Sequence, residues 1–289
     1  MLTVKVRRPR TELRPYVRTF VQRQIGLDSP VLKEPTTAQL EQILMFDFGI
    51  PTQAVFEDEQ IRTIQPTSVA GAQTRFACHM HLRGGIEAFG IFFSPTAFVH
   101  LFGIPSCELT DTQGDAEGMV GNTVRALWNR LGETSSFEER VLIAEEFLIY
   151  RATRAKPGST IVAVADYIFR HHGAVTIADL AYECSIGVRQ FEREFRRQTG
   201  ASPKRFARIA RFQAALDAKV AAPQRTWLDI AHSFGYYDQM HMIRDFEMLG
   251  HSCPTQLITE IGDSRPPGLA LTEEDLATAT HLLADPQAF

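Results

Sequence analysis

Two stretches of the chain decide its fold, because each repeats the pattern of the other. Residues 179–203 are DLAYECSIGVRQFEREFRRQTGASP, and residues 229–254 are DIAHSFGYYDQMHMIRDFEMLGHSCP. The DLA of the first stretch recurs 50 residues later as DIA, and the R-x-F at 193–195 recurs 51 residues later at 244–246. A one-residue difference is expected in a turn, since turn length is freer than packed positions. The repeat predicts two copies of a short helix, a turn and a second helix.

Helix start and stop signals surround both copies. Thr160 begins a helix that Gly173 ends, Thr176 and Thr226 stand at N-cap positions, and Ser202-Pro203 is an N-cap followed by proline at the first helical position. These signals predict helices over 177–183, 188–198, 203–220, 227–234 and 238–249, with a short helix from Pro254. Almost everything after Ser159 is therefore expected to be helical.

The apolar residues of each copy share one helical face. Leu180 and Ala181 are expected to face Phe191 and Phe195, and Ile230 and Ala231 are expected to face Met242 and Phe246. Helical spacing makes these aromatic rings core residues rather than stacking platforms for single-stranded nucleic acid. The opposite face of each second helix is left for a partner.

Charge is concentrated beside the first copy. The whole chain has a formal net charge of −4, yet between Arg189 and Arg211 there are eight basic and two acidic residues, a net charge of +6. Because phosphate binding needs local positive potential, the overall charge argues against a nucleic-acid partner and its distribution argues for one. We expect one surface of the protein to attract DNA.

The upstream half has a different pattern. Short apolar runs at 17–21, 43–48, 76–82 and 86–93 are typical of strands, and 96–102, 120–131 and 137–150 have helical spacing. The breaker cluster Ala155-Lys156-Pro157-Gly158-Ser159 separates the halves. The predicted fold is α+β: a mixed β-sheet or barrel-like domain with helices over 1–155, an all-α domain of two helix-turn-helix units joined by a long helix over 156–262, and a tail over 263–289. A helix over 272–283 and a frayed end are equal alternatives for this tail.

Composition excludes several other classes. With 289 residues, 44% of them hydrophobic and 22% charged, the chain resembles a folded globular protein rather than a disordered or fibrous one. The four cysteines lie far apart without a C-x-x-C spacing, so they indicate reduced thiols rather than disulfides or a zinc knuckle. No apolar stretch approaches the roughly 20 residues of a membrane span, and no export signal begins the chain. A cytoplasmic location is expected.

The repeated motifs resemble the AraC/XylS family of bacterial transcription regulators. The likeness covers about 160–261 and rests on R-x-F-x-R-x-F-x(4)-G-x-S-P at 189–203 and on G-Y-x-D-Q-x-H-x-x-R-x-F at 235–246. It implies a DNA-binding domain whose two helix-turn-helix units are joined by the helix over 203–220. Eighteen helical residues span about 27 Å, which can place two recognition helices about one DNA turn, about 34 Å, apart.

The resemblance also assigns residues to DNA. The positions that reach base edges are Arg189, Glu192, Arg193, Gln239, Met240, Ile243 and Arg244. An arginine such as Arg193 suits a bidentate contact with guanine. The flanking candidates for phosphate contact are Gln190, Arg196, Arg197, Lys204, Arg205, Arg208 and His241. The chain departs from the family pattern at Ser185, Gly187, His251 and Cys253, where a turn glycine, a Ser/Thr cap, a glycine and a serine are usual.

Part of the upstream half resembles the uncharacterised sensor-type domain that precedes this helical domain in one branch of the family. The likeness rests on RPYV at 14–17, VAGAQT at 69–74, FGIFFSP at 89–95 and ELTD at 108–111. Phe46, Phe48, Phe76, Phe89 and Phe92 could line a ligand pocket or pack a core, and the sequence does not distinguish these alternatives.

Three functions compete. The leading hypothesis is a sequence-specific DNA-binding transcription regulator controlled by its N-terminal domain. In the second, the chain is a ligand-binding or protein-interaction module whose DNA contact is secondary. In the third, the N-terminal half is a metal- or thiol-dependent enzyme that uses Cys78, His79 and His81; two imidazoles without a third ligand make this the weakest. We therefore expect no enzyme activity, no metal and no cofactor. The expected partner is double-stranded DNA, and RNA polymerase, a small-molecule effector and a second copy of the chain are candidates.

Overall fold

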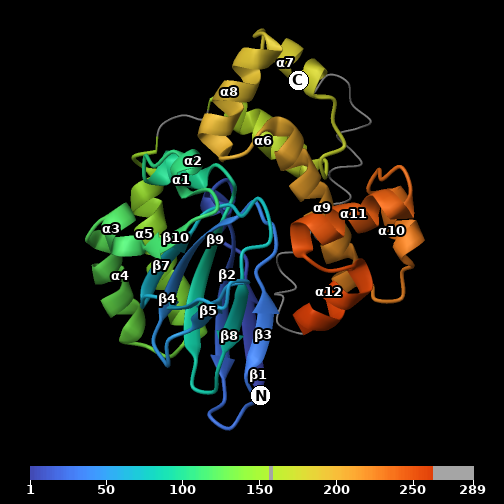
Figure 1. The fold of residues 1–289 in the computed structure, drawn as a ribbon. Coiled ribbons are helices and arrows are strands. Elements are labelled where there is room, and N and C mark those ends of the chain that lie inside the picture. The colour runs from blue at the N-terminus through green and yellow to red at the C-terminus, as the bar shows by residue number, and fades with distance from the viewer. Residues whose placement is uncertain (156–158, 263–289) are drawn as a thin grey trace.

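The computed structural model describes residues 1–155 and 159–262. A sheet-rich half forms the lower part of the molecule in Figure 1, and a helical half covers its top and one side. The predicted tail helix over 272–283 lies outside the described residues. The α+β class and the order of a sheet domain before an all-helical region are confirmed.

Two antiparallel sheets form the N-terminal half. The first has the strand order β1-β2-β9-β4-β7-β10 and the second has the order β3-β8-β5-β6. The strands of the first sheet are β1 (Leu2–Arg7), β2 (Val17–Ile25), β9 (Glu87–Phe93), β4 (Gln42–Asp47), β7 (Thr67–Ala70) and β10 (Gln113–Asp115). Those of the second are β3 (Leu32–Pro35), β8 (His79–Leu82), β5 (Gln53–Val55) and β6 (Ile61–Thr63).

One face of the first sheet is covered by helices. Successive side chains of a strand point to opposite faces, so Leu44 and Phe46 of β4 join the core beneath the helices, whereas Ile43 and Met45 face the second sheet. The core contains Leu127 and Val141 from the helical layer. The helices are η1 (Thr11–Leu13), α1 (Ala97–Leu101), α2 (Ser106–Leu109), α3 (Ala116–Val120), α4 (Thr123–Gly132) and α5 (Phe137–Ala152).

Seven helices form the described C-terminal half. They are α6 (Thr160–Arg170), α7 (Ile177–Glu183), α8 (Val188–Thr199), α9 (Pro203–Ala221), α10 (Trp227–Ser233), α11 (Gln239–Gly250) and α12 (Pro254–Ile261). All the helices predicted in this half are confirmed, with ends within a few residues of their predicted positions. Ser202 accepts a hydrogen bond from the amide of Arg205, and Thr226 accepts one from the amide of Asp229, as capping requires. Thr176 makes no side-chain cap bond.

The two halves share part of one core. Ala38 and Leu40, from the segment between β3 and β4, are fully buried in the hydrophobic cluster of the helical half. The amide of Ala38 donates to the carbonyl of Leu249 at 2.8 Å, and the amide of Leu40 donates to Oε1 of Gln213 at 3.0 Å. Glu41 then accepts from Nε2 of Gln213 at 2.6 Å. A short segment of the sheet-rich half is therefore inserted into the core of the helical half.

A second contact lies at the junction of α8 and α9. Arg205 donates through Nε to the carbonyl of Thr74 at 3.0 Å. Gly200 ends α8 with a φ of +82°, and a Cβ atom there would collide with Oγ1 of Thr110. Only glycine combines this left-handed conformation with so close an approach of the two halves.

Candidate functional site

Helix α8 is amphipathic and shows its polar face to solvent. Phe191 and Phe195 are fully buried, and the Phe195 ring packs edge-on against Phe206 of α9 with centroids 5.3 Å apart. The base-edge candidates Arg189, Glu192 and Arg193 are all exposed. The helix is thus fixed by its apolar face and leaves the other face open, which is the arrangement of a recognition helix.

Helix α11 repeats this arrangement. Met242 and Phe246 are fully buried, with the Phe246 ring packed on Phe212 at a centroid distance of 4.8 Å. Asp238 caps the helix by accepting from the amide of His241 at 2.6 Å. The base-edge candidates of this copy are exposed except for Ile243, which is half-buried; they are Gln239, Met240, Ile243 and Arg244.

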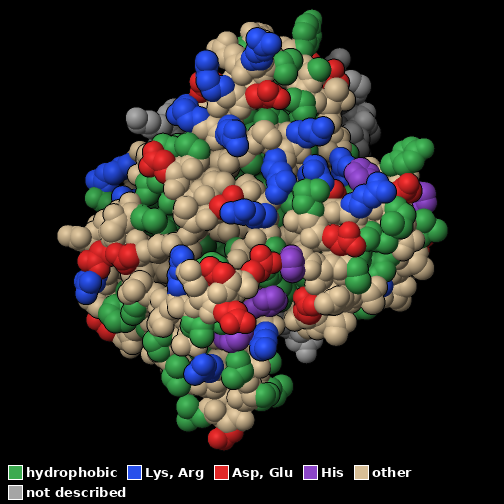
Figure 2. All heavy atoms as spheres, viewed as in Figure 1, with side chains coloured by type: hydrophobic (Ala, Val, Ile, Leu, Met, Phe, Trp, Pro, Cys, Tyr) green, Lys and Arg blue, Asp and Glu red, His purple; other side chains and the backbone are tan. Residues whose placement is uncertain are grey.

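The phosphate candidates fall into two groups. Those on the open surface are Gln190, Arg196, Arg197 and Lys204. The half-buried ones make internal contacts: Arg205 donates to Thr74, Arg208 pairs with the buried Asp245 at 2.5 Å, and His241 accepts from the amide of Tyr237 at 3.5 Å. Arg208 therefore ties α9 to α11. Figure 2 shows Lys and Arg side chains gathered over the upper, helical part of this face of the molecule.

Two exposed tyrosines lie close in the chain to α8 and α11 and are not among the residues that the sequence assigns to DNA. Tyr182 of α7 is 81% exposed and Tyr237, just before α11, is 90% exposed. Tyrosine hydroxyls are common donors to DNA phosphates. Their exposure cannot be predicted from the sequence, because hydropathy alone assigns aromatic rings to a core.

The departures from the family pattern have structural consequences. Ser185, in the turn between α7 and α8, has a φ of +55°, and His251, after α11, has a φ of +60°. Both positions hold a conformation that favours glycine. Gly187 is the N-cap of α8 and has no side chain to bond the first turn, as the sequence indicates, and Cys253 likewise makes no cap bond at α12.

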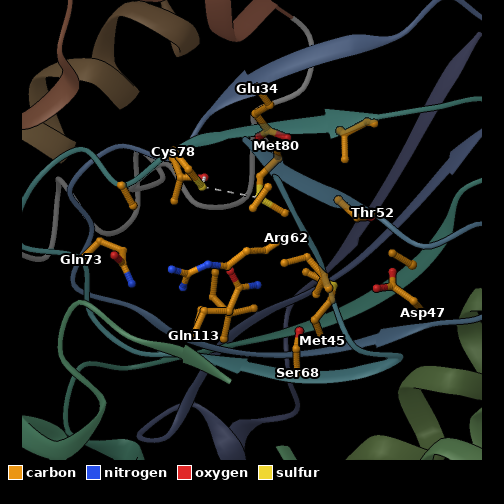
Figure 3. A pocket seen from close by; sticks show the side chains of 18 of the residues that line it. Glu34, Met45, Asp47, Thr52, Arg62, Ser68, Gln73, Cys78, Met80 and Gln113 are labelled. Carbon is orange, nitrogen blue, oxygen red and sulfur yellow. Dashed lines mark hydrogen bonds between the residues drawn. The ribbon is translucent and has the colours of Figure 1, made fainter. Parts of the chain in front are cut away.

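A cavity of about 510 Å³ lies between the two sheets, where Figure 3 shows it from close by. Its lining is mostly apolar and includes Ile43, Met45, Met80 and Phe92, and Ile261 of α12 also reaches it. Of the five phenylalanines considered as pocket residues, only Phe92 lines it. Phe46 and Phe89 belong to the core beneath the helices because their strand positions point to that face, Phe48 stacks on Trp128, and Phe76 stacks on His251.

One carboxyl group among the described lining residues of this cavity has no hydrogen bond. Asp47, at the end of β4, is 6% exposed, and its Oδ1 atom is buried without a hydrogen bond within the described structure. Burial away from water raises the pKa of this carboxyl to about 7. The sequence reasoning missed Asp47, because the burial of a carboxylate at a strand end is not visible in a strand pattern.

Cys78, His79 and His81, the residues of the weakest hypothesis, lie in or directly before β8. Cys78 is buried, which raises the pKa of its thiol, and its Sγ lies 3.7 Å from Oγ1 of Thr36. His79 packs edge-on against Phe76. No group of three or more potential metal ligands is found among residues 1–155 and 159–262. A raised thiol pKa makes a poorer nucleophile at neutral pH.

Two family models match the chain. Residues 180–260, which include α8 and α11, match the helix-turn-helix domain family, and residues 5–115 match a domain of unknown function (DUF6597). No protein of curated function matches the chain closely in sequence. The helices described in residues 159–262 are not long and apolar enough to cross a membrane, nor are those in residues 1–155.

Solved structures with a similar arrangement are those of ToxT from Vibrio cholerae. The ToxT structure from strain O395 has 8% sequence identity and a TM-score of 0.47, over 91% of this chain and 98% of that one. The same protein bound to (E)-4-(8-methylnaphthalen-1-yl)but-3-enoic acid has 9% identity and a TM-score of 0.49, over 90% and 99%.

The helical half therefore defines the class: a DNA-binding protein with a double helix-turn-helix unit behind a sheet-rich domain. The chain carries a helix-turn-helix domain over residues 180–260 and a DUF6597 domain over residues 5–115.

Proposed function

We propose that this protein is a sequence-specific transcription regulator in which α8 and α11 of one chain enter successive major grooves under the control of the N-terminal domain. The observation that carries the proposal is the repetition itself: two helices, each buried on its aromatic face and open on its polar face. Helix α9 joins them, and its 19 residues span about 28 Å.

In this proposal the exposed residues that contact DNA have two different roles. Arg189, Arg193, Gln239 and Arg244 read base edges, since an arginine fork matches guanine and a glutamine amide matches adenine. Arg196, Arg197 and Lys204 hold the backbone without reading sequence. In this proposal the protein is cytoplasmic, its partner is double-stranded DNA, and it is not an enzyme. RNA polymerase and a second copy of the chain are further candidate partners.

Control by the N-terminal domain is supported by the contacts between the halves. Segment 38–41 is inserted into the helical core, and Ile261 of α12 lines the cavity between the sheets. A molecule in that cavity would touch both halves at once. A ligand can shift a conformational equilibrium only by binding its states with different affinity, and in this proposal that difference comes from contacts of one ligand with both halves.

The test is selection of bound duplexes from a random DNA pool by the full-length protein at two salt concentrations. We expect an asymmetric site with two conserved blocks about one helical turn apart, and binding that weakens steeply with salt. Replacing Arg193 and Arg244 together with alanine should cost about 2–6 kcal/mol of specific affinity, at about 1–3 kcal/mol for each base contact.

A matched control removes two arginines of the other half, the half-buried Arg7 and the exposed Arg130, as Arg7→Ala with Arg130→Ala; their partners are Glu138 and Glu146. This control should bind the selected site normally. Equal affinity of a folded Arg193→Ala/Arg244→Ala variant and the wild type would refute the assignment of these residues. If the full-length protein enriches no sequence at either salt concentration, DNA contact is secondary in this protein.

A further inference from the structure

The cavity between the two sheets has an apolar lining and carries its charged side chains at separate places. Its apolar lining comes from both sheets, with Ile43 and Met45 of β4 opposite Met80 of β8 and Ala54 of β5. Asp47 stands at one end of the cavity in Figure 3, and Arg62 of β6 extends into it nearer to Gln73. A volume of about 510 Å³ is within the range of small-molecule sites, which are mostly apolar with a few polar groups that fix orientation.

Asp47 differs from the other carboxylates of this lining. Glu34 forms an ion pair with Arg23 at 2.6 Å. Asp111 accepts from the amide and hydroxyl of Thr74 at 2.6 and 2.7 Å, and Asp115 caps α3 by accepting from the amides of Glu117 and Gly118. Among the described lining residues, Asp47 is thus the carboxylate whose side chain lacks a hydrogen bond.

The burial of Asp47 without a protein partner carries a free-energy cost. A buried carboxylate without a cation or donors loses its hydration and gains nothing in return. No neighbouring charge contributes to the raised pKa of this group, which follows from burial alone. A ligand that brings a positive charge to Asp47 therefore relieves a cost that the protein already carries, and that relief adds to its affinity.

We propose that this cavity binds a small amphipathic amine, whose protonated nitrogen pairs with the Asp47 carboxylate and whose apolar part lies between the two sheets. The inference rests on the proposed function, since it names the ligand class that the N-terminal domain of this regulator would sense. The nitrogen would also be within a polar end of the cavity that includes Ser68 and Thr52.

Arg62 offers the rival chemistry, an anionic ligand. Its strand is exposed, its guanidinium lies 4.7 Å from the Phe56 ring centroid, and it donates to Gln60 at 3.4 Å. A cation that is already hydrated and stacked gains less from a new partner than a desolvated carboxylate does. The cavity therefore favours a cation over a carboxylate.

The affinity should depend on pH. Primary amines stay protonated up to a pH of about 10, so the group that titrates is Asp47. The other ionisable side chains lining the cavity are Arg23, Glu34, Arg62, Cys78, Asp111 and Asp115. Below a pH of about 7 the ligand must displace a proton from Asp47, so its affinity should fall about tenfold for each further unit of pH.

The experiment measures thermal unfolding and calorimetric binding of the full-length protein at pH 8 with straight-chain primary amines from butyl to decyl. The alcohols and carboxylates of the same lengths are the matched probes. We expect amines to bind at least tenfold more tightly than the matched alcohols, and carboxylates to bind least. Asp47→Asn should abolish the preference for amines, whereas Asp28→Asn, at an exposed turn, should keep it.

Two outcomes would overturn the proposal: no amine binding better than its alcohol, or carboxylates binding best in a way that Arg62→Gln abolishes. Selection of DNA by the same preparation separates this proposal from the proposed function. If a DNA site is selected but amines show no preference, only the ligand class is wrong. If amines bind through Asp47 but the full-length protein selects no DNA with or without a bound amine, the regulator proposal fails instead.

Discussion

Replacing Glu41 with alanine is expected to weaken the junction between the two halves of the molecule. Glu41 is 2% exposed, and it bridges the halves because its Oε1 accepts from Arg18 at 2.5 Å and its Oε2 accepts from Gln213 at 2.6 Å. Arg18 also lies over the Phe169 ring of α6 at 4.5 Å. Glu41→Ala therefore removes the hydrogen-bond acceptors of both Arg18 and Gln213.

The magnitude follows from this burial. Removing one partner of a buried ion pair costs about 3–5 kcal/mol. The Arg18 side chain keeps 14% exposure, so water partly replaces its lost partner and the lower end, about 3 kcal/mol, applies. For a protein of this size, that loss lowers the melting temperature by about 6–12 °C.

The assay pairs thermal unfolding with hydrogen exchange of the Ala38 and Leu40 amides, which bond to the helical half. Both amides should exchange faster in Glu41→Ala. Glu145→Ala is the matched control, because it removes a buried carboxylate that pairs with Arg10 inside the N-terminal half. It should lower stability without selectively exposing these two amides. A melting temperature within about 2 °C of wild type, with unchanged exchange, would refute the reasoning.

Three further predictions concern single residues. Ser185→Gly should stabilise the protein by about 0.5–1 kcal/mol in urea unfolding, since it relieves the φ of +55°, whereas Ser185→Ala should not. His172 has a pKa lowered from 6.5 to about 4, by burial first and then by the charges of His171 and Arg18. The folded state therefore resists protonation, and stability should fall by about 2–3 kcal/mol as the pH drops from 6.5 to about 4, a dependence that His172→Asn should reduce in thermal melts. The raised pKa of Asp47 has the opposite sign: stability should fall as the pH rises from 3.8 to about 7, so Asp47→Asn should raise the melting temperature more at pH 8 than at pH 5.

The helices that could be predicted from the sequence depend on interactions between residues close together in the chain. Residues 179–203 and 229–254 specify their helices through caps, glycine stops and 3.6-residue periodicity, all of which act between neighbours in the chain. The exposure of Arg189, Arg193 and Arg244 follows in turn, because burying one face of a helix leaves the opposite face to solvent. The helix-turn-helix half and its exposed helix faces could therefore be predicted from the sequence alone.

Contacts between distant segments could not be read in this way. Ala38 and Leu40 are in the helical core, Arg205 is turned toward Thr74, and Asp47 is isolated at the end of a cavity. Each of these facts depends on which segments meet across more than a hundred residues or across two sheets, and a strand pattern specifies alternation but not its partners. The sequence on its own determined the DNA-binding half and its candidate residues. The tertiary structure alone decided the insertion between the halves and the chemistry of the cavity, because burial and desolvation are properties of the packed chain.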